Sequence, residues 1–477
     1  MLNRLIIVII IVSVFLGAST LTRGHNWGDD FASYIMQAGS ILNGSTQGFV
    51  ERNSFTIFES SNQIGPVAYP WGYPIILTPV YAIKGIHPLS LKLPGLLFYA
   101  GFLICLYLLM KQRLTQAETL VLVSLFAFNP LLLQFLDQIL SDIPFLFFST
   151  LALLLLSDRN RDNDIHYTLI GIIIFFAFFI RTTGILLLAS FVAFEIFTIL
   201  GHYANRDQTR RRFRNVLITC LAFGCLFLTN LWLFPGGEMS HLALYQEFAI
   251  KTALGFASAY FQVFNLFFGE ATAWRIIYYI VFVFFLLGMW FKRKEELLFI
   301  MFFSFWMILL ITWPAWQGPR FIFPLLPLFI YFAFEGMKAV AGKYARTGQW
   351  LFYGFWLSII GVFLLNSGAN AYINVRNDRG INGPFDPYSR EVYNYIKEKT
   401  TPDSVVIFFK PRVMAMMTEH PSLMSTECDR MRKGEYIVLS KKVGENQQIP
   451  PEEIDACNLP LHEVLKNNRF IVYEIQK

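Results

Sequence analysis

The chain has few charged residues. Aspartate, glutamate, lysine and arginine make up 15% of its 477 residues, whereas soluble domains carry about 25%. Hydrophobic residues reach 55%. This composition excludes a soluble protein of this size, and the chain is far too long to cross a bilayer only once. The sequence therefore predicts a polytopic membrane protein.

Cysteine is also scarce, with five residues in the chain. Three of them, Cys105, Cys220 and Cys225, lie in apolar runs and are interpreted as packing residues. Cys428 and Cys457 lie in the polar C-terminal part. They can form a disulfide there if that part lies outside the cytoplasm.

The net charge of +6 indicates topology rather than a nucleic-acid partner, because the basic residues concentrate in short loops between apolar runs. The strongest of these inside markers is the arginine-rich loop 206–214. The apolar run 5–21 resembles a signal peptide, but the many later spans favour an uncleaved first transmembrane helix. Residue 4, an arginine, is then inside.

Apolar runs of sufficient length predict about eleven transmembrane helices. The first outer loop, 22–72, should contain an interfacial amphipathic helix over 32–42, followed by a short half-helix at 73–86. A later outer loop, 235–275, should also hold interfacial helices. The predicted spans are 5–21, 89–110, 117–135, 143–157, two shortened spans within 167–200 that break at 181–184, 216–234, one ending at 292, one ending near 313, 320–338 and 350–366.

The composition changes to charged and turn-rich residues from about 370. Alternating helix and strand patterns there predict a small extracytoplasmic α/β domain. The expected helices are 389–399 and 412–418, and the expected strands are 405–409, 436–439 and 470–475. The sequence thus predicts an all-α membrane module over 1–366 and a soluble domain over 370–477.

Four polar positions fall on the outer face in this topology: the pair Asp29-Asp30, Asp142, Arg181 and Arg320. Charged groups at membrane depth are costly and are usually functional. Two arginines suit a phosphate, and a carboxylate can take a proton from an attacking hydroxyl. Purely structural roles stay open, since the aspartates can cap helices and the arginines can anchor spans at the interface.

Several short motifs accompany these positions. They are Trp27-Gly28-Asp29-Asp30, Tyr69-Pro70-Trp71-Gly72-Tyr73-Pro74, Ser141-Asp142-Ile143-Pro144, Arg181-Thr182-Thr183-Gly184 and Arg320-Phe321-Ile322-Phe323-Pro324-Leu325-Leu326-Pro327. In this order, over residues 5–340, they resemble the polytopic glycosyltransferases of the GT-C fold. That group includes protein O-mannosyltransferases and the aminoarabinose transferases of lipid A.

The resemblance implies a transferase that moves a sugar, a hexose or a pentose, from a polyprenyl-phosphate donor in a single inverting displacement. The acceptor would be a lipid, glycan or protein on the outer face of the cell (inner) membrane. Asp29 would be the base or the acceptor-orienting carboxylate, with Asp30 as its partner and Asp142 near the acceptor. Arg181 and Arg320 would bind the donor phosphate. Tyr69 and Tyr73 would line the donor or acceptor groove.

Two matters stay open at the level of sequence. The second residue of the acidic pair is Asp rather than the more usual Glu, which leaves undecided which carboxylate is the base. Asp29, Asp30 and His25 are close enough in sequence to share a divalent cation, Mg²⁺ or Mn²⁺, but nothing requires one.

The competing interpretations are a transporter or flippase for a lipid-linked or anionic substrate, and a non-catalytic assembly protein. A transporter would place its charges near the bilayer midplane between inverted halves, whereas these charges lie at span ends on one face. An assembly protein would leave the ordered aspartate and arginine positions without a role.

Overall fold

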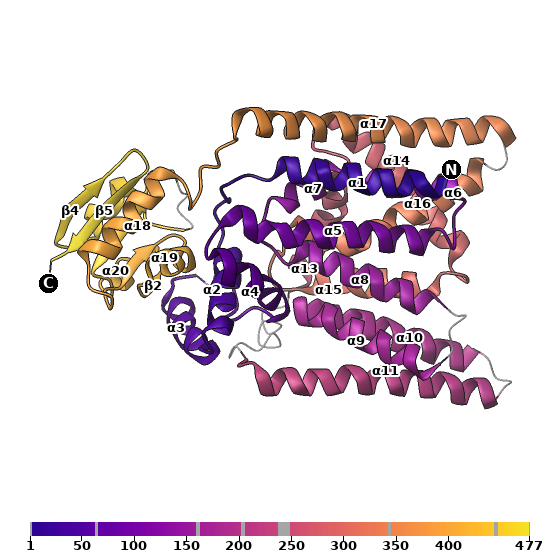
Figure 1. Cartoon of the computed structure of the whole chain (residues 1–477), viewed down its shortest axis with the longest axis horizontal. Helices are drawn as coiled ribbons and strands as arrows, with labels where there is room; N and C mark the ends of the chain where they lie inside the picture. Colours follow the sequence, from indigo (N-terminus) through magenta and orange to yellow (C-terminus); the bar gives the residue numbers. More distant parts are fainter. Residues whose placement is uncertain are drawn as a thin grey trace.

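The protein consists of a long helical bundle with a smaller α/β region at one end (Figure 1). The N-terminus lies at the end of the bundle away from the α/β region, and the C-terminus lies within that region. The computed structural model describes residues 2–62, 65–158, 163–201, 206–236, 249–341, 345–442 and 447–476.

Within the described residues, six helical segments are long and apolar enough to cross a membrane, and a seventh span results if one bent pair is counted together. The six are α5 (Pro88–Met110), η1 with α10 (Thr182–Gly184 and Ile185–Gly201), α11 (Arg206–Leu233), α14 (Thr272–Lys292), η4 with α16 (Pro319–Leu325 and Leu326–Ala341) and α17 (Ala345–Asn377). Four shorter apolar helices accompany them: α1 (Leu2–Thr20), α8 (Asp142–Ser157), α9 (Asp164–Ile180) and α15 (Leu297–Thr312). The prediction of a mainly helical, polytopic membrane protein is confirmed.

The predicted span 117–135 corresponds to a pair of helices, α6 (Gln116–Ala127) and α7 (Pro130–Leu136), bent by 50°. Pro130 cannot donate the hydrogen bond that would continue α6. Asn129 then caps the new helix, because its side chain accepts a hydrogen bond from the amide of Leu132 at 3.2 Å.

The predicted break at 181–184 is confirmed. Helix α9 ends at Ile180, and Arg181 has the extended backbone of a connecting residue. A Cβ on Gly184 would overlap the backbone of Phe178, so only glycine allows the chain to turn this tightly against α9.

Three helices follow α1 on the side of the bundle that faces the α/β region: α2 (Asp30–Leu42), α3 (Thr46–Glu59) and α4 (Gly72–Lys84). Helix α4 is the short helix predicted at 73–86. The prediction that α2 lies on the membrane surface is wrong, because most of its residues are buried. Helices α3, α4 and α19 (Pro411–Thr418) all pack against it.

The predicted outer loop 235–275 is only partly described. Helix α13 (Ile250–Val263) and the short helix η3 (Phe264–Phe267) form after residue 249. The expectation for 237–248 lies outside the described residues. Helix α17 runs to Asn377, well past the end predicted at 366, so the last helix of the bundle extends beyond its apolar part before the chain enters the α/β region.

The α/β region contains a five-stranded sheet with strand order β2-β1-β3-β5-β4. Strand β1 pairs in parallel with β2 and β3, and β5 pairs antiparallel with β3 and β4. Its elements are α18 (Pro387–Lys399), β1 (Val406–Phe408), α19, β2 (Ser422–Leu423), α20 (Cys428–Met431), β3 (Tyr436–Ser440), η6 (Pro451–Cys457), β4 (Leu461–Lys466) and β5 (Phe470–Ile475). The C-terminal α/β fold predicted from the sequence is confirmed, although β2 and β4 were not expected.

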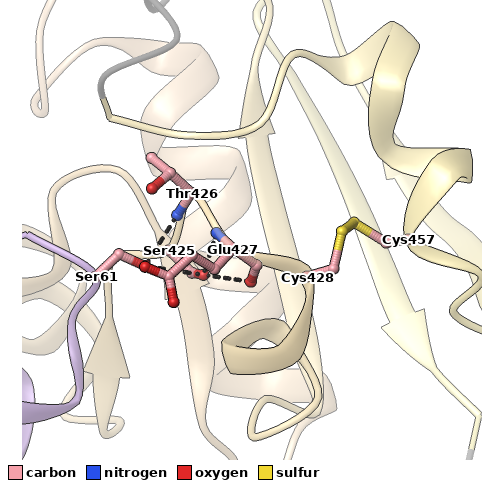
Figure 2. The surroundings of a disulfide bond; sticks show 6 residues. All are labelled: Ser61, Ser425, Thr426, Glu427, Cys428 and Cys457. Carbon is pink, nitrogen blue, oxygen red and sulfur yellow. Dashed lines mark hydrogen bonds between the residues drawn. A yellow bond between two sulfur atoms is a disulfide. The ribbon is translucent and has the colours of Figure 1, made fainter.

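A disulfide joins Cys428 to Cys457 (Figure 2). It ties α20 to η6, directly after the segment 425–427 that lies beside Ser61, which follows α3. The pairing expected for an extracytoplasmic region is therefore present in the structure. Cys105, Cys220 and Cys225 are free.

Candidate functional site

Four charged residues, far apart in the sequence, meet at the end of the bundle that faces the α/β region. Asp30 begins α2, Asp142 begins α8, Arg181 follows α9, and Arg320 lies in η4. All four occupy the ends of helices, where a charged side chain avoids the apolar middle of a span.

The four side chains form an alternating chain of charges. Arg320 pairs with Asp30 on one side, and its Nη1 lies 3.8 Å from Oδ2 of Asp142 on the other. Arg181 pairs with the other oxygen of Asp142. Asp142 is 2% exposed, so its carboxylate is almost wholly enclosed by the two guanidinium groups and the protein around it.

Tyr69 completes the surroundings of Asp30. Its hydroxyl donates a hydrogen bond to Oδ1 of Asp30 at 2.6 Å. Burial would raise the pKa of Asp30, but the Arg320 charge and the hydrogen bonds from Tyr69 and Arg320 outweigh it and hold the pKa below its ordinary value. Gln37 fixes the backbone of Tyr69 by donating to its carbonyl at 2.8 Å and accepting from its amide at 3.2 Å.

Asp29 has different surroundings from Asp30. It is 7% exposed, and its Oδ2 lies 3.5 Å from Nζ of Lys410. Burial raises the pKa of Asp29, against the opposing charges of Lys410 and Arg412. Asp29 occupies the N-cap position of α2, but its side chain makes no capping hydrogen bond. Within the described residues its Oδ1 has no hydrogen-bond partner.

Two further residues lie apart from the site, and one of them, Tyr73, was expected to line it. Tyr73 is 2% exposed and packs edge-on against Tyr34 with ring centroids 5.0 Å apart, so it lies behind the site. Asp137, which lies close to Asp142 in the sequence, instead pairs with the buried Lys92 at 2.6 Å and accepts from the amide of Thr22 at 2.6 Å. This pair fixes the start of the first outer loop.

A cavity of about 630 Å³ opens beside the charged chain. Asp30, Tyr69, Arg181 and Arg320 line its polar end. Asp29, Asp142 and Tyr73 are not among its lining residues. The remaining wall is largely apolar and aromatic and includes Phe178, Phe179, Leu231, Phe234, Leu309, Leu310 and Trp313. The cavity therefore joins a cationic end to a long apolar wall contributed by several helices.

The guanidinium group of Arg181 is held on two sides. Asp142 pairs with it, and the ring of Phe321 lies 4.1 Å from its central carbon, as in a cation–π contact. The side chain of Arg181 is 12% exposed and that of Arg320 is 26% exposed. Both cations are preorganised at the cavity wall without being sealed away from it.

Comparison with known proteins places this arrangement in a structural class. The structure is similar to that of ArnT from Cupriavidus metallidurans, with a TM-score of 0.60, 11% identity, and coverage of 99% of this chain and 98% of ArnT. This match extends over the bundle and the α/β region together. The protein has the GT-C fold. The resemblance predicted from the sequence motifs is confirmed.

Two more GT-C structures are similar to this chain. AglB, the oligosaccharyltransferase of Archaeoglobus fulgidus, gives a TM-score of 0.57 with 10% identity, covering 100% of this chain and 74% of AglB. The mycobacterial arabinofuranosyltransferase AftD gives 0.53 with 12% identity, covering 99% of this chain and 41% of AftD. No curated protein sequence matches the chain.

A family model also matches part of the GT-C module. Residues 68–233 match the model described as dolichyl-phosphate-mannose-protein mannosyltransferase. The matched segment contains Tyr69, Asp142 and Arg181, whereas Asp29, Asp30 and Arg320 lie outside it. The sequence similarity thus includes two of the four charged residues of the site, Asp142 and Arg181.

The residues considered for a shared cation do not fit one. Nδ1 of His25 lies 2.7 Å from the carbonyl oxygen of Asn26, and its Nε2 accepts from the amide of Ile139 at 3.0 Å. Burial lowers the pKa of His25 to about 3, so its ring is neutral and both nitrogens are used by the backbone. In the described part of the chain no three His, Cys, Asp or Glu residues gather as metal ligands do.

Sequence reasoning missed three cations, two of which lie near the site. Lys92 is buried within α5, where a lysine in an apolar run was a usable signal. Lys410 and Arg412 come from the α/β region, where basic residues are ordinary and nothing in the local pattern marks them.

Proposed function

We propose that this protein is a glycosyltransferase that moves a sugar from a polyprenyl-phosphate donor to a lipid, glycan or protein outside the cytoplasm. The observation that carries the proposal is the cavity of about 630 Å³, whose cationic end continues into an apolar wall. A polyprenyl phosphate has the same two-part chemistry, an anionic head on a long hydrocarbon chain.

The related structures support this assignment of the donor. ArnT from C. metallidurans is described bound to undecaprenyl phosphate. AglB from A. fulgidus is described in complex with dolichol-phosphate and an inhibitory peptide. Since the present chain shares their fold over nearly its whole length, a lipid-linked phosphate is the substrate class that its own cavity suits.

Arg181 and Arg320 would bind the donor phosphate. Arginine offers several donors in a planar arrangement that matches phosphate oxygens, and both side chains line the cavity. Both oxygens of Asp142 form ion pairs with guanidinium groups, so this carboxylate is committed to the two arginines. We therefore revise its role, from a carboxylate near the acceptor to one that orients both guanidinium groups.

The two adjacent aspartates would divide the work on the acceptor. Asp30 keeps its charge and lines the cavity, so it orients the acceptor and Arg320. Asp29 does not line the cavity itself but directly precedes Asp30, which does, and its raised pKa and an oxygen that no described residue hydrogen-bonds suit the base. The acceptor oxygen or nitrogen attacks the anomeric carbon, its proton passes to Asp29, and the bond from that carbon to the phosphate oxygen breaks with its electron pair leaving on the phosphate. Attack opposite the leaving group inverts the configuration.

The orientation in the membrane follows from charge and redox chemistry. Basic residues such as Arg113, Lys292 and Lys338 gather with their glutamate partners at span ends, and such clusters favour the cytoplasmic side. The disulfide Cys428–Cys457 suits an oxidising compartment. We infer an inner-membrane protein whose site and α/β region are extracytoplasmic, with the membrane module ending at Asn377 rather than 366.

The proposal is tested with purified protein in nanodiscs and a panel of radiolabelled polyprenyl-phosphate sugars. Wild type should release or transfer sugar from at least one donor. Asp29→Asn should abolish turnover while the protein stays folded in the membrane, and Arg320→Ala should raise the apparent donor KM, because a charge-assisted bond of about 1.5–3 kcal/mol is lost.

Turnover by Asp29→Asn at the wild-type rate would remove Asp29 from the mechanism. An unchanged donor KM in Arg320→Ala would make Arg320 a structural anchor. If no donor supports turnover, flux of labelled lipid across a sealed bilayer is the next measurement, and flux would favour the transporter interpretation.

A further inference from the structure

The α/β region reaches into the site through the start of α19. Lys410 precedes this helix and lies beside Asp29. Arg412 is fully buried and is among the largest fully buried side chains of the described residues. Its guanidinium group lies over the ring of Tyr69, 5.4 Å from the ring centroid, and donates to the carbonyl of Pro66. A buried arginine placed in this way is costly unless its contacts repay the lost hydration.

The contacts of Arg412 fix a wall of the cavity. Gly65, Pro66 and Tyr69 all line the cavity. Arg412 holds this segment at the carbonyl of Pro66, and Gln37 holds it at the backbone of Tyr69. Gly65 has a φ of +123°, and a Cβ there would lie 2.9 Å from the Tyr69 hydroxyl and 3.3 Å from Nη1 of Arg412. The segment therefore has one close-fitting arrangement, and it sets where the Tyr69 hydroxyl meets Asp30.

Lys410 and Arg412 also change the sign of the net charge at the site. When ionised, Asp29, Asp30 and Asp142 together outnumber Arg181 and Arg320, so the bundle alone leaves one net negative charge. This net charge weakens the attraction of the site as a whole for an anionic phosphate, although the two arginines line the cavity. The two cations from the α/β region reverse the balance to one net positive charge.

The α/β region is anchored independently of these two cations. The amide of Ser61 donates to the carbonyl of Met424 at 2.9 Å, and Nη1 of Arg430 donates to the carbonyl of Ser60 at 2.8 Å. Figure 2 shows Ser61 beside the segment that precedes Cys428. On the other side, Trp27 packs against Phe409 with ring centroids 4.9 Å apart. Mutations can therefore separate the docking of the α/β region from the charges that Lys410 and Arg412 bring to the site.

We propose that the α/β region is a working part of the active site rather than an appendage: Arg412 positions Tyr69 and the cavity wall, and Lys410 positions Asp29 and supplies charge for an anionic donor. The inference rests on the proposed function, since it concerns the same cavity. Neither residue lines the cavity, so both act through other groups as positioning residues.

The test uses the full-length chain in nanodiscs and measures binding of undecaprenyl phosphate alongside sugar transfer. Lys410→Gln and Arg412→Gln should each weaken binding about tenfold. Arg412→Lys keeps the charge and should bind within about threefold of wild type, but it loses the guanidinium contacts with the Tyr69 ring and the Pro66 carbonyl and should still lower kcat about tenfold. Arg430→Gln is the matched control, because it removes a docking contact outside the site, and it should change neither value by more than about twofold.

The outcomes separate the two levels of the proposal. If wild type does not bind undecaprenyl phosphate, the proposed function fails and this inference fails with it. If wild type binds while Lys410→Gln and Arg412→Gln bind equally well, only the inference is overturned. A loss in Arg430→Gln as large as that in Arg412→Gln would also overturn it, since docking alone would then explain the effect.

Discussion

Adjacent aspartates at the start of α2 show how surroundings separate two identical side chains. Asp30 faces Arg320 and Tyr69, and its pKa is lowered, whereas burial raises the pKa of Asp29. One carboxylate is therefore kept ionised, and its neighbour is better suited to accept a proton. This difference supports the proposal that Asp29 rather than Asp30 is the base, a question that the sequence left open.

The charges around Asp29 predict a pH effect. The groups that act on it are Lys410 and Arg412, which lower its pKa, and Asp30, which raises it. Lys410→Gln removes a lowering charge, so the pKa of Asp29 should rise further. Because a base works only when deprotonated, the acidic limb of the pH–rate profile should move to higher pH. The measurement is kcat against pH at saturating donor, with Arg430→Gln as the control, and an acidic limb that stays in place would contradict the role of Asp29.

At the residue level, the sequence predicts what the bundle contributes. Asp30, Asp142, Arg181 and Arg320 are conspicuous because each interrupts or ends an apolar run, where a charge is expensive. Lys410 and Arg412 carry no such signal, because a basic residue in a polar segment is ordinary. Their importance comes only from the packing of α19 against α2, which spacing along the chain does not encode.

Among the elements, α14 and α16 approach most closely through two glycines. A Cβ on Gly288 would overlap the carbonyl oxygen of Phe332, and one on Gly336 would overlap the carbonyl oxygen of Phe284. Small residues at such a crossing let the two backbones touch. Helix α16 continues from η4, which carries Arg320, so this crossing helps to position the residue that we propose binds the donor phosphate.

Gly288→Leu should therefore push α14 and α16 apart and destabilise the bundle by about 1–3 kcal/mol or more, as overpacked cores do. The measurement is the thermal unfolding midpoint in detergent, together with donor KM. Gly361→Leu in α17 is the matched control, because nothing lies within 4 Å of a Cβ placed there. Equal midpoints for the two variants would show that the close crossing does not limit stability.

Among whole helices and strands, the apolar spans can be predicted from the sequence, whereas several elements outside them cannot. Long apolar runs identify the spans because backbone groups in a bilayer must be satisfied within a helix. Strands β2 and β4 were missed for different reasons: β2 has two residues, and β4 is largely exposed without a buried face to give it alternation. The polar helix α3 has no apolar periodicity strong enough to stand out, since its partners lie in the α/β region and in α2.

At the scale of the whole molecule, the disulfide lies where the two parts meet. Cys428 directly follows the segment whose Thr426 amide donates to the hydroxyl of Ser61 at 3.2 Å. Replacing both cysteines, as Cys428→Ser with Cys457→Ser, should destabilise the α/β region by about 2–4 kcal/mol. Sugar transfer should fall as the docking segment loosens, while the bundle stays intact.

Limited proteolysis of the protein in nanodiscs measures this loosening, with sugar transfer followed in the same samples. The control is Cys225→Ser, because Cys225 is free and exposed. If the double variant resists protease as wild type does and transfers sugar at the same rate, the disulfide does not maintain the docking.

The C-terminal end of α11 contacts both the cavity and the outside of the bundle. Leu231 lines the cavity and is 58% exposed, and its neighbour Trp232 is 83% exposed on the outside of the bundle. Under the proposed function, a carrier lipid that enters here does so by sliding within the bilayer. The quantity that governs encounter is then carrier molecules per unit area of membrane rather than per volume of solution. Dilution of proteoliposomes would leave the rate per enzyme unchanged, whereas enlarging each vesicle with inert lipid would lower it.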